Sequence, residues 1–297
     1  MTISAQLVKE LRERTGAGMM ECKNILAEAE GDIEKAIELL RKKGLAKADK
    51  KAGRIAAEGI MMSALSADGR SGVILEINCE TDFVAKNEDF LGFAKQAADI
   101  VLSGAATDMA QLLDAPLNGA TVEEARRTLV AKLGENINLR RFARYARSEA
   151  GAVAAYLHGG RIGVLLEVAG SHANLAELAR DIAMHVAAMK PEFTRTSDVP
   201  ADRVAKEKEI LTAQATESGK PAEIIEKMIV GRLNKNLAEL CLLNQPFVKN
   251  PDLTIEALQK NYGDAQVLQF VRFEVGEGIE KAETASFAEE VMAQVRG

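Results

Sequence analysis

The sequence predicts an α+β fold whose centre is a duplicated strand–strand–helix unit. Two apolar, β-branched runs, 72–77 and 163–168, repeat almost residue for residue, and each is typical of a buried strand. A helix with matching apolar positions follows each run, and a further strand is expected late in each half, at 136–142 and 266–275. Strands and helices that succeed one another in this way are typical of the α+β class.

Residues 4–43 predict three short helices that pack as a small bundle. Glycines interrupt the first helix, Gly31 ends the second, and Asp32 caps the third, which is expected to end near Gly44. Residues 44–58 are then expected to form a basic connector that is only partly helical. A core this small is marginal, and such modules usually serve for docking rather than for catalysis.

Met19 and Met20 directly follow the glycine turn after the first helix. Adjacent helical residues cannot both point squarely at one core, so we expect one methionine inside and the other at the surface. Methionine is a soft, adaptable contact residue at recognition surfaces. The pair is therefore a candidate docking element of the N-terminal bundle.

The two core copies are expected to contain the same series of elements. Each opens with two strands joined by a tight turn and continues into a helix, at 60–65, 73–77 and 88–102 in the first copy and at 153–157, 162–168 and 173–189 in the second. The first copy adds a helix at 121–133, because Thr121 and Glu124 form a capping-box pattern and Gly134 ends the apolar repeat.

Two long helices, 200–218 and 221–243, interrupt the second copy and predict an antiparallel hairpin. Such a hairpin suits contact with another subunit or partner, and a self-contained α-hairpin fits the pattern equally well. A short helix is expected at 254–261 and a last one at 284–295.

These elements divide the chain into six parts. They are an N-terminal helical module with its basic linker, the first core copy, the second core copy, the inserted hairpin, a return to the second copy, and a C-terminal helical module: 1–54, 55–148, 149–198, 199–245, 246–276 and 277–297. A chain of 297 residues is long enough for several such units, each with its own core.

The composition disfavours nucleic acid as a direct partner. Hydrophobic residues make up 47% of the chain and charged residues 28%, the values of an ordinary soluble protein. Aromatic residues are only 4%, Trp is absent and the net charge is −6, so neither base stacking nor phosphate contact is supported. Residues 1–54 carry a net charge of +3, which fits docking onto an acidic partner and equally fits a chance distribution of charge.

The three cysteines, Cys22, Cys79 and Cys241, are far apart and odd in number, which predicts a reducing compartment rather than a disulfide framework. The N-terminal residues lack the pattern of a signal peptide, and no apolar run reaches the length of a membrane span. We therefore expect a cytoplasmic protein without a membrane partner.

No constellation of residues predicts an enzyme, a metal site or a cofactor site. The histidines His158, His172 and His185 lack metal-ligand spacing, and His185 lies in an apolar helix typical of a hydrogen-bonded structural histidine. Gly276 and Gly278 belong to no complete phosphate-binding fingerprint, and no nucleophile motif occurs.

The strongest functional signal is the polar stretch 78–87, between a buried strand and the following helix. The strands of the two copies are offset by 91 positions but the helices by 85, so the first copy has six extra residues in the stretch that contains Phe83. Because the second copy closes without them, the surplus favours a function over a structural need. In the alternative, Thr81 or Asp82 caps a helix and Phe83 packs on its next turn as a hydrophobic staple.

Five motifs occur in order along the chain: LRERTGAGMM at 11–20, TDFVAK at 81–86, GENIN at 134–138, HVAA at 185–188 and RFEVGEGIEK at 272–281. Together they make the chain resemble the bacterial elongation factor Ts family, whose members exchange guanine nucleotide on elongation factor Tu. The resemblance covers essentially the whole length. It implies an N-terminal ubiquitin-associated-like (UBA-like) module, a duplicated α+β core, an inserted coiled-coil hairpin and a C-terminal helical module.

The resemblance also implies which residues contact the partner GTPase. The positions are Thr81, Asp82, Phe83 and Val84 near the partner's Mg²⁺, and Met19, Met20, Lys23, Leu133, Gly134 and His158 elsewhere. The C-terminal module beyond Gly276 is a contact surface of the family, and the helical hairpin is a candidate contact for a homodimer.

The implied activity makes and breaks no bond and needs no cofactor. The loop of Asp82 and Phe83 is expected to enter the partner near its Mg²⁺ and nucleotide, so that GDP leaves and GTP rebinds. In an alternative hypothesis the chain is a non-catalytic scaffold that binds peptides through its N-terminal three-helix module.

Overall fold

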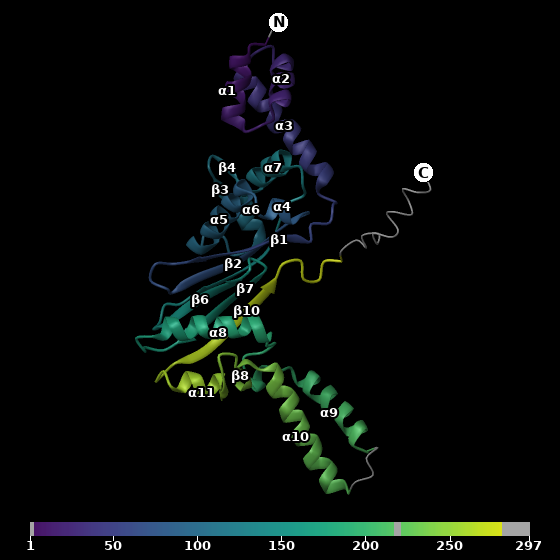
Figure 1. Ribbon diagram of the computed structural model, residues 1–297, viewed down its shortest axis with the longest axis vertical. Coiled ribbons are helices and arrows are strands. Elements are labelled where there is room, and N and C mark those ends of the chain that lie inside the picture. The colour runs from purple at the N-terminus through teal and green to yellow at the C-terminus, as the bar shows by residue number, and fades with distance from the viewer. Residues whose placement is uncertain (1–2, 217–220, 281–297) are drawn as a thin grey trace, which may run out of the picture. The chain divides into compact units, whose positions relative to one another are not determined.

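The computed structural model describes residues 3–216 and 221–280, and its helices and small sheets confirm the α+β class (Figure 1). The helix expected at 284–295, and with it most of the C-terminal module, lies outside the described residues. Within them, no helix combines the length and the apolar character that crossing a membrane requires.

Three helices, α1 (Ala5–Thr15), α2 (Met19–Glu28) and α3 (Ile33–Lys51), form the N-terminal bundle. Ser4 caps α1 by accepting a hydrogen bond from the Leu7 N–H, and Gly16 ends it in the left-handed conformation at φ +66°. The core of the bundle consists of Val8, Leu11, Cys22, Ile25, Leu26, Ala29 and Ala36.

The expected end of α3 near Gly44 is wrong, because the helix continues to Lys51. A Cβ atom at Gly44 would lie 3.3 Å from the Ala131 side chain of α7 (Val122–Leu133). Glycine at this position therefore lets two helices approach closely and does not end α3. Much of the expected connector 44–58 is helical as a result.

The first three-stranded sheet has the order β1 (Glu58–Leu65), β2 (Ser71–Cys79) and β5 (Asn138–Ala146), with β2 in the centre. The helix α5 (Glu88–Ser103) follows β2, and α7 precedes β5. The capping box of α7 is confirmed: the Thr121 hydroxyl accepts from the Glu124 N–H, and the Glu124 carboxylate accepts from the Thr121 N–H.

The second sheet has the order β10 (Gln266–Glu274), β7 (Ile162–Ala169) and β6 (Gly151–His158), again with the middle strand of the copy in the centre. β6 and β7 form an antiparallel hairpin, and α8 (Leu175–Met189) packs against both. The core of this copy includes Val164, Leu166, Val168, Leu178, Ile182, Val186 and Val267.

The duplication holds at the level of single buried positions. Val73 to Ile77 on β2 and Val164 to Val168 on β7 are buried at every position. On the helices, the buried Phe90, Phe93, Ala94, Ala97, Ala98 and Val101 of α5 correspond to the buried Leu175, Leu178, Ala179, Ile182, Ala183 and Val186 of α8. The six surplus residues therefore lie between β2 and the first buried position of α5.

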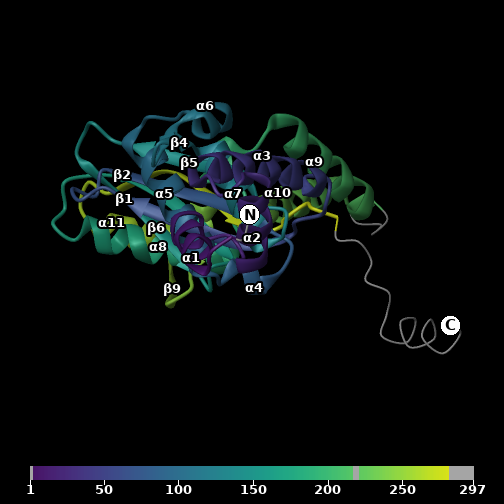
Figure 2. The same ribbon diagram turned by 90° about the horizontal axis from the view of Figure 1, so that it is seen from above.

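The inserted helices α9 (Ala201–Thr216) and α10 (Ala222–Leu240) lie side by side (Figures 1 and 2), with a small core of Leu211, Ala215 and Ile229. Several short elements were not expected from the sequence: α6 (Met109–Asp114), the pair β3 (Pro116–Leu117) and β4 (Ala120–Thr121), and the pair β8 (Pro246–Phe247) and β9 (Asn250–Thr254). The short helix α11 (Ile255–Lys260) was expected.

The chain divides into two compact units. One contains residues 1–62, 75–142 and the segment from 274, and the other contains residues 63–74 and 143–273. The division into six parts expected from the sequence stays a prediction.

His185 on α8 is fully buried, and its hydrogen bonds define one tautomer. The Val248 N–H donates to Nδ1 at 3.2 Å, so the proton of the neutral ring lies on Nε2, which donates to Gln245 Oε1 at 3.0 Å. Gln245 uses its own Nε2–H to donate to the Glu239 carbonyl. The expectation of a hydrogen-bonded structural histidine is confirmed.

We expect the free energy of unfolding to decrease as the pH falls below the ordinary histidine value of 6.5. Burial lowers the pKa of His185, and its hydrogen bond to Gln245 only partly offsets this, so the unfolded chain takes up the proton first. Urea unfolding between about pH 5 and 7.5 measures the slope. His185→Gln should lose part of it and the exposed His172→Gln should keep it; equal slopes in all three proteins would refute the assignment.

Candidate functional site

Phe83 lies on a short helix, α4 (Asp82–Ala85), between β2 and α5. Its side chain is 81% exposed, whereas the following Val84 and Ala85 are each only 9% exposed. Among the large apolar side chains of the described residues, Phe83 has the highest exposed fraction. An aromatic ring is therefore presented to solvent on a turn whose other apolar residues are buried.

The expected polar loop is thus partly helical, and Thr81 is its N-cap. The Thr81 hydroxyl accepts a hydrogen bond from the Val84 N–H at 3.4 Å, which confirms the capping half of the alternative interpretation. The staple half is wrong, because the exposed ring of Phe83 packs on no following turn. Asp82 forms an exposed ion pair with Lys86 at 2.7 Å, a contact that contributes little to stability.

Two glutamates hold the chain immediately before α4. Glu135 Oε2 accepts hydrogen bonds from the N–H groups of Glu80 and Thr81, each at 3.0 Å, and its Oε1 accepts from the Thr81 hydroxyl at 2.6 Å. Glu80 Oε1 in turn accepts from the Asn136 N–H at 2.6 Å. We call these four hydrogen bonds the Glu80–Glu135 clamp.

The end of α7 carries the other half of this clamp. Gly134 ends α7 in the left-handed conformation at φ +83°, and its carbonyl accepts a hydrogen bond from Lys51 Nζ. The Asn136 side chain donates to the Arg54 carbonyl at 2.7 Å, and the Arg54 guanidinium lies 3.6 Å from the Glu80 carboxylate. The end of α7, the end of β2 and the residues after α3 are thereby bonded together.

Cys79, the last residue of β2, is buried beside the clamp and donates its S–H to the Thr81 carbonyl at 3.1 Å. Burial, with a further contribution from the Glu135 carboxylate, raises the pKa of the thiol to about 12. The sulfur therefore stays protonated at neutral pH and acts as a packed side chain.

The structure corrects the expectation for Met19 and Met20. Both are exposed, at 60% and 66%, because the core face of α2 is occupied by Cys22, Ile25 and Leu26. The expectation that one of the two methionines faces the core is wrong. The two side chains form an exposed apolar pair at the start of α2.

The remaining residues suggested by the family resemblance are found at different depths. Lys23 on α2 and His158 at the end of β6 are exposed, and Leu133 and Gly134 are half-buried. Gly134 lies next to Glu135, whose carboxylate accepts a hydrogen bond from the Thr81 N–H. His158 belongs to the other compact unit.

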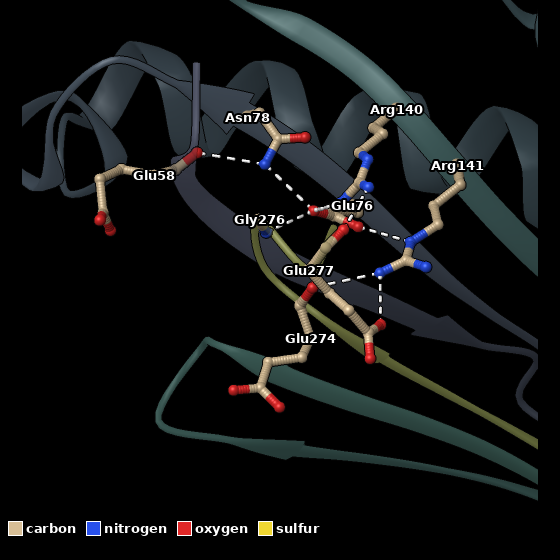
Figure 3. A network of polar contacts seen from close by, with 8 residues as sticks. All are labelled: Glu58, Glu76, Asn78, Arg140, Arg141, Glu274, Gly276 and Glu277. Carbon is tan, nitrogen blue, oxygen red and sulfur yellow. Dashed lines mark hydrogen bonds and ion pairs between the residues drawn. The ribbon is translucent and has the colours of Figure 1, made fainter. Parts of the chain in front are cut away.

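A buried carboxylate that the sequence analysis missed lies on β2, the strand that leads into the site (Figure 3). Glu76 is 0% exposed. It accepts hydrogen bonds from the Asn78 amide at 3.1 Å, Arg140 Nη1 at 2.9 Å, Arg141 Nε at 2.6 Å and the Gly276 N–H at 2.8 Å. A buried charge with this many donors is stabilised in its ionised form.

This network also holds the chain where it leaves β10 (Figure 3). Arg141 Nη2 donates to the Glu274 carbonyl and to Glu277 Oε2, both at 3.1 Å. Gly276 has a φ of +75°, and a Cβ atom there would lie 2.3 Å from the Ala57 carbonyl oxygen. Only glycine fits here, between the Glu76 network and Ala57, the residue before β1.

The pKa of Glu76 reflects a competition. Burial raises it, but the donors, led by the Gly276 N–H, outweigh burial and lower the pKa below its ordinary value. Glu167 occupies the position on β7 that corresponds to Glu76 on β2. It accepts hydrogen bonds from Arg147 at 2.8 Å and Gln269 at 2.7 Å. The signal that could have revealed both residues was an acid repeated inside two apolar runs.

The model of the family described as elongation factor TS matches residues 80–277. The chain belongs to the elongation factor Ts family. Three relatives named elongation factor Ts are similar along the whole chain: 60% identity in Acidithiobacillus ferrooxidans, 58% in Thioalkalivibrio sulfidiphilus and 58% in Methylococcus capsulatus, over 100% of this chain and 99–100% of each relative.

Family membership confirms the resemblance seen in the sequence motifs, and with it a role in translation elongation. The range matched by the family model begins at Glu80 and includes both halves of the clamp, α4 and Phe83. It ends at Glu277, inside the turn that the Glu76 network holds.

Proposed function

We propose that this chain promotes release of GDP from elongation factor Tu, so that GTP can rebind. In this proposal Phe83 enters the GTPase near its Mg²⁺ and nucleotide, and Asp82 is its polar neighbour. The observation that supports it best is the ring of Phe83, 81% exposed on a turn held by the clamp and by two buried residues. Membership in the elongation factor Ts family supports the choice of partner.

Burial of one aromatic side chain is large enough to drive such a reaction. A phenylalanine removes about 150–250 Å² from water, a gross gain of roughly 4–6 kcal/mol at about 25 cal/mol per Å². Transfer of even about 4 kcal/mol to the nucleotide site weakens nucleotide binding roughly a thousandfold. Mg²⁺ requires near-ideal octahedral geometry, so a small displacement of its ligands is enough to release it.

The coupling between factor and nucleotide is reciprocal. If the bound chain weakens GDP, then GDP weakens the bound chain by the same factor, and GTP acts in the same way. The chain therefore speeds exchange without changing which nucleotide is favoured at equilibrium. It makes and breaks no covalent bond in this scheme.

The other residues of the stretch have separate roles in the proposal. Thr81 and Val84 are proposed as partner contacts beside Phe83, and within the chain Thr81 caps the turn and the buried Val84 anchors it. The exposed Met19, Met20 and Lys23 on α2 form a second contact with the partner. Leu133, Gly134 and His158 are proposed as further contact positions.

Release of a fluorescent GDP analogue from elongation factor Tu tests the proposal. The loaded GTPase is mixed with excess unlabelled GDP, with and without the chain, and the decay of fluorescence is timed. We expect a rate that rises with the concentration of the chain and then saturates. A rate that does not change would refute exchange activity and favour the scaffold hypothesis, for which the exposed methionines of α2 are the docking surface.

A further inference from the structure

The Glu80–Glu135 clamp joins two segments 55 residues apart in the sequence, directly before the helix that carries Phe83. We infer that Glu135 is a positioning residue for nucleotide exchange: its carboxylate fixes the start of α4, so that Phe83 is presented to the GTPase in one orientation. The inference rests on the proposed function and adds to it a residue that acts through the orientation of Phe83.

The hydrogen bonds of Thr81 transmit the effect. Its hydroxyl proton goes to Glu135 Oε1 at 2.6 Å, so its lone pairs are free to accept from the Val84 N–H at 3.4 Å. Glu135 therefore determines the direction of the hydroxyl that caps α4. A chain of hydrogen bonds runs from a carboxylate through Thr81 to the residue next to Phe83.

Four residues are too few for α4 to be stable alone, because an isolated turn pays the nucleation cost of a helix without its later hydrogen bonds. The contacts that hold it are the clamp, the Thr81 cap and the burial of Val84 and Ala85. Without Glu135, the N–H groups of Glu80 and Thr81 lose their acceptor, and the turn samples other conformations. The fraction of chains that present Phe83 correctly then falls, and the apparent activity falls with it.

Other hydrogen bonds near the clamp do not use the Glu135 side chain. Glu80 and Thr81 lie in the stretch between β2 and α5 that contains the surplus, and at the corresponding place in the second copy the N–H and hydroxyl of Ser171 donate to the Asp264 carboxylate. Glu80 is held separately, by the Asn136 N–H and beside Arg54. Loss of the Glu135 side chain should therefore leave the sheet and α7 folded.

A double-mutant cycle tests the inference. At saturating chain, Glu135→Ala should lower the maximal rate of GDP release roughly tenfold, the size of one charged hydrogen bond. In the Phe83→Ala background the same substitution should change that rate less than about twofold, because Glu135 acts through Phe83. Equal losses in both backgrounds would overturn the inference, since they would show general destabilisation.

Glu123→Gln is the matched control, because Glu123 lies on the same helix and pairs with Arg126 and Arg127 but bonds neither Glu80 nor Thr81. It should lower the melting temperature without lowering the maximal exchange rate. Glu135→Gln keeps the size of the side chain and one acceptor oxygen, so it should fold and give an intermediate rate. A Glu135→Gln rate equal to wild type would contradict the inference.

A second readout needs no partner. The chain contains no Trp, so Phe83→Trp creates a single fluorescent reporter on α4. Time-resolved anisotropy should show a restricted indole when Glu135 is present and a larger amplitude of fast motion in the Glu135→Ala variant. Equal amplitudes would overturn the inference. If instead Phe83→Ala exchanges nucleotide normally, the proposed role of Phe83 fails, while the anisotropy comparison still decides whether Glu135 orders the turn.

Discussion

Phe83→Ala should slow the release of GDP from elongation factor Tu by about thirtyfold or more, since truncation of an aromatic interface anchor costs about 2 kcal/mol or more. The loss is expected in exchange and not in folding. The side chain is 81% exposed, so its removal takes almost no buried surface from the native state. Stopped-flow release of labelled GDP and urea unfolding of the same preparation measure the two effects.

Leu65→Ala is the control for this prediction. Leu65 is also an exposed apolar residue, at 47%, but it lies in the other compact unit at the end of β1. We expect it to change neither the exchange rate nor the unfolding midpoint by much. If Phe83→Ala unfolds the chain, or if both variants slow exchange equally, the ring of Phe83 is not the element that acts on the nucleotide.

Glu76→Ala should destabilise the chain by about 3 kcal/mol or more, the usual cost of removing one partner from a buried ionic network. The carboxylate is fully buried, and its removal takes one acceptor from each of two guanidinium groups, an amide and a backbone N–H. The free energy of unfolding in urea measures the loss.

The control uses a second glutamate of the same network. Glu277 pairs with Arg141 at 3.1 Å, but its side chain is 53% exposed, so Glu277→Ala should cost less than about 1 kcal/mol. Equal losses for the two variants would show that burial of Glu76 is not what makes it important. Glu76→Gln should lie between them, because the amide keeps one acceptor oxygen.

The sequence predicted the duplicated core well because burial there follows the strand and helix periods directly. Val73 to Ile77 and Phe90 to Val101 are buried at the positions that their apolar spacing indicated. Local capping was also readable, since the Thr121–Glu124 box and the Gly134 stop depend on neighbours within one turn. Phe83 could be singled out because the second copy lacks its six-residue surplus.

The parts that could not be predicted depend on tertiary neighbours. Gly44 resembled a helix end, but it permits the approach of Ala131, which is 87 positions away. Glu135 was visible in the sequence only as part of the motif at 134–138, and only the fold brings it to Thr81. Glu76 was hidden inside an apolar strand, because its partners on β5 and at Gly276 are far along the chain. Single-sequence patterns do not encode such pairings.

The most direct test of the central claim is a crystal structure of the chain bound to nucleotide-free elongation factor Tu. We predict that the ring of Phe83, 81% exposed in the free chain, is buried against the GTPase domain beside the emptied nucleotide site, with α4 unchanged. A complex in which that ring remains in solvent, or folds back onto its own chain, would contradict the proposed mechanism.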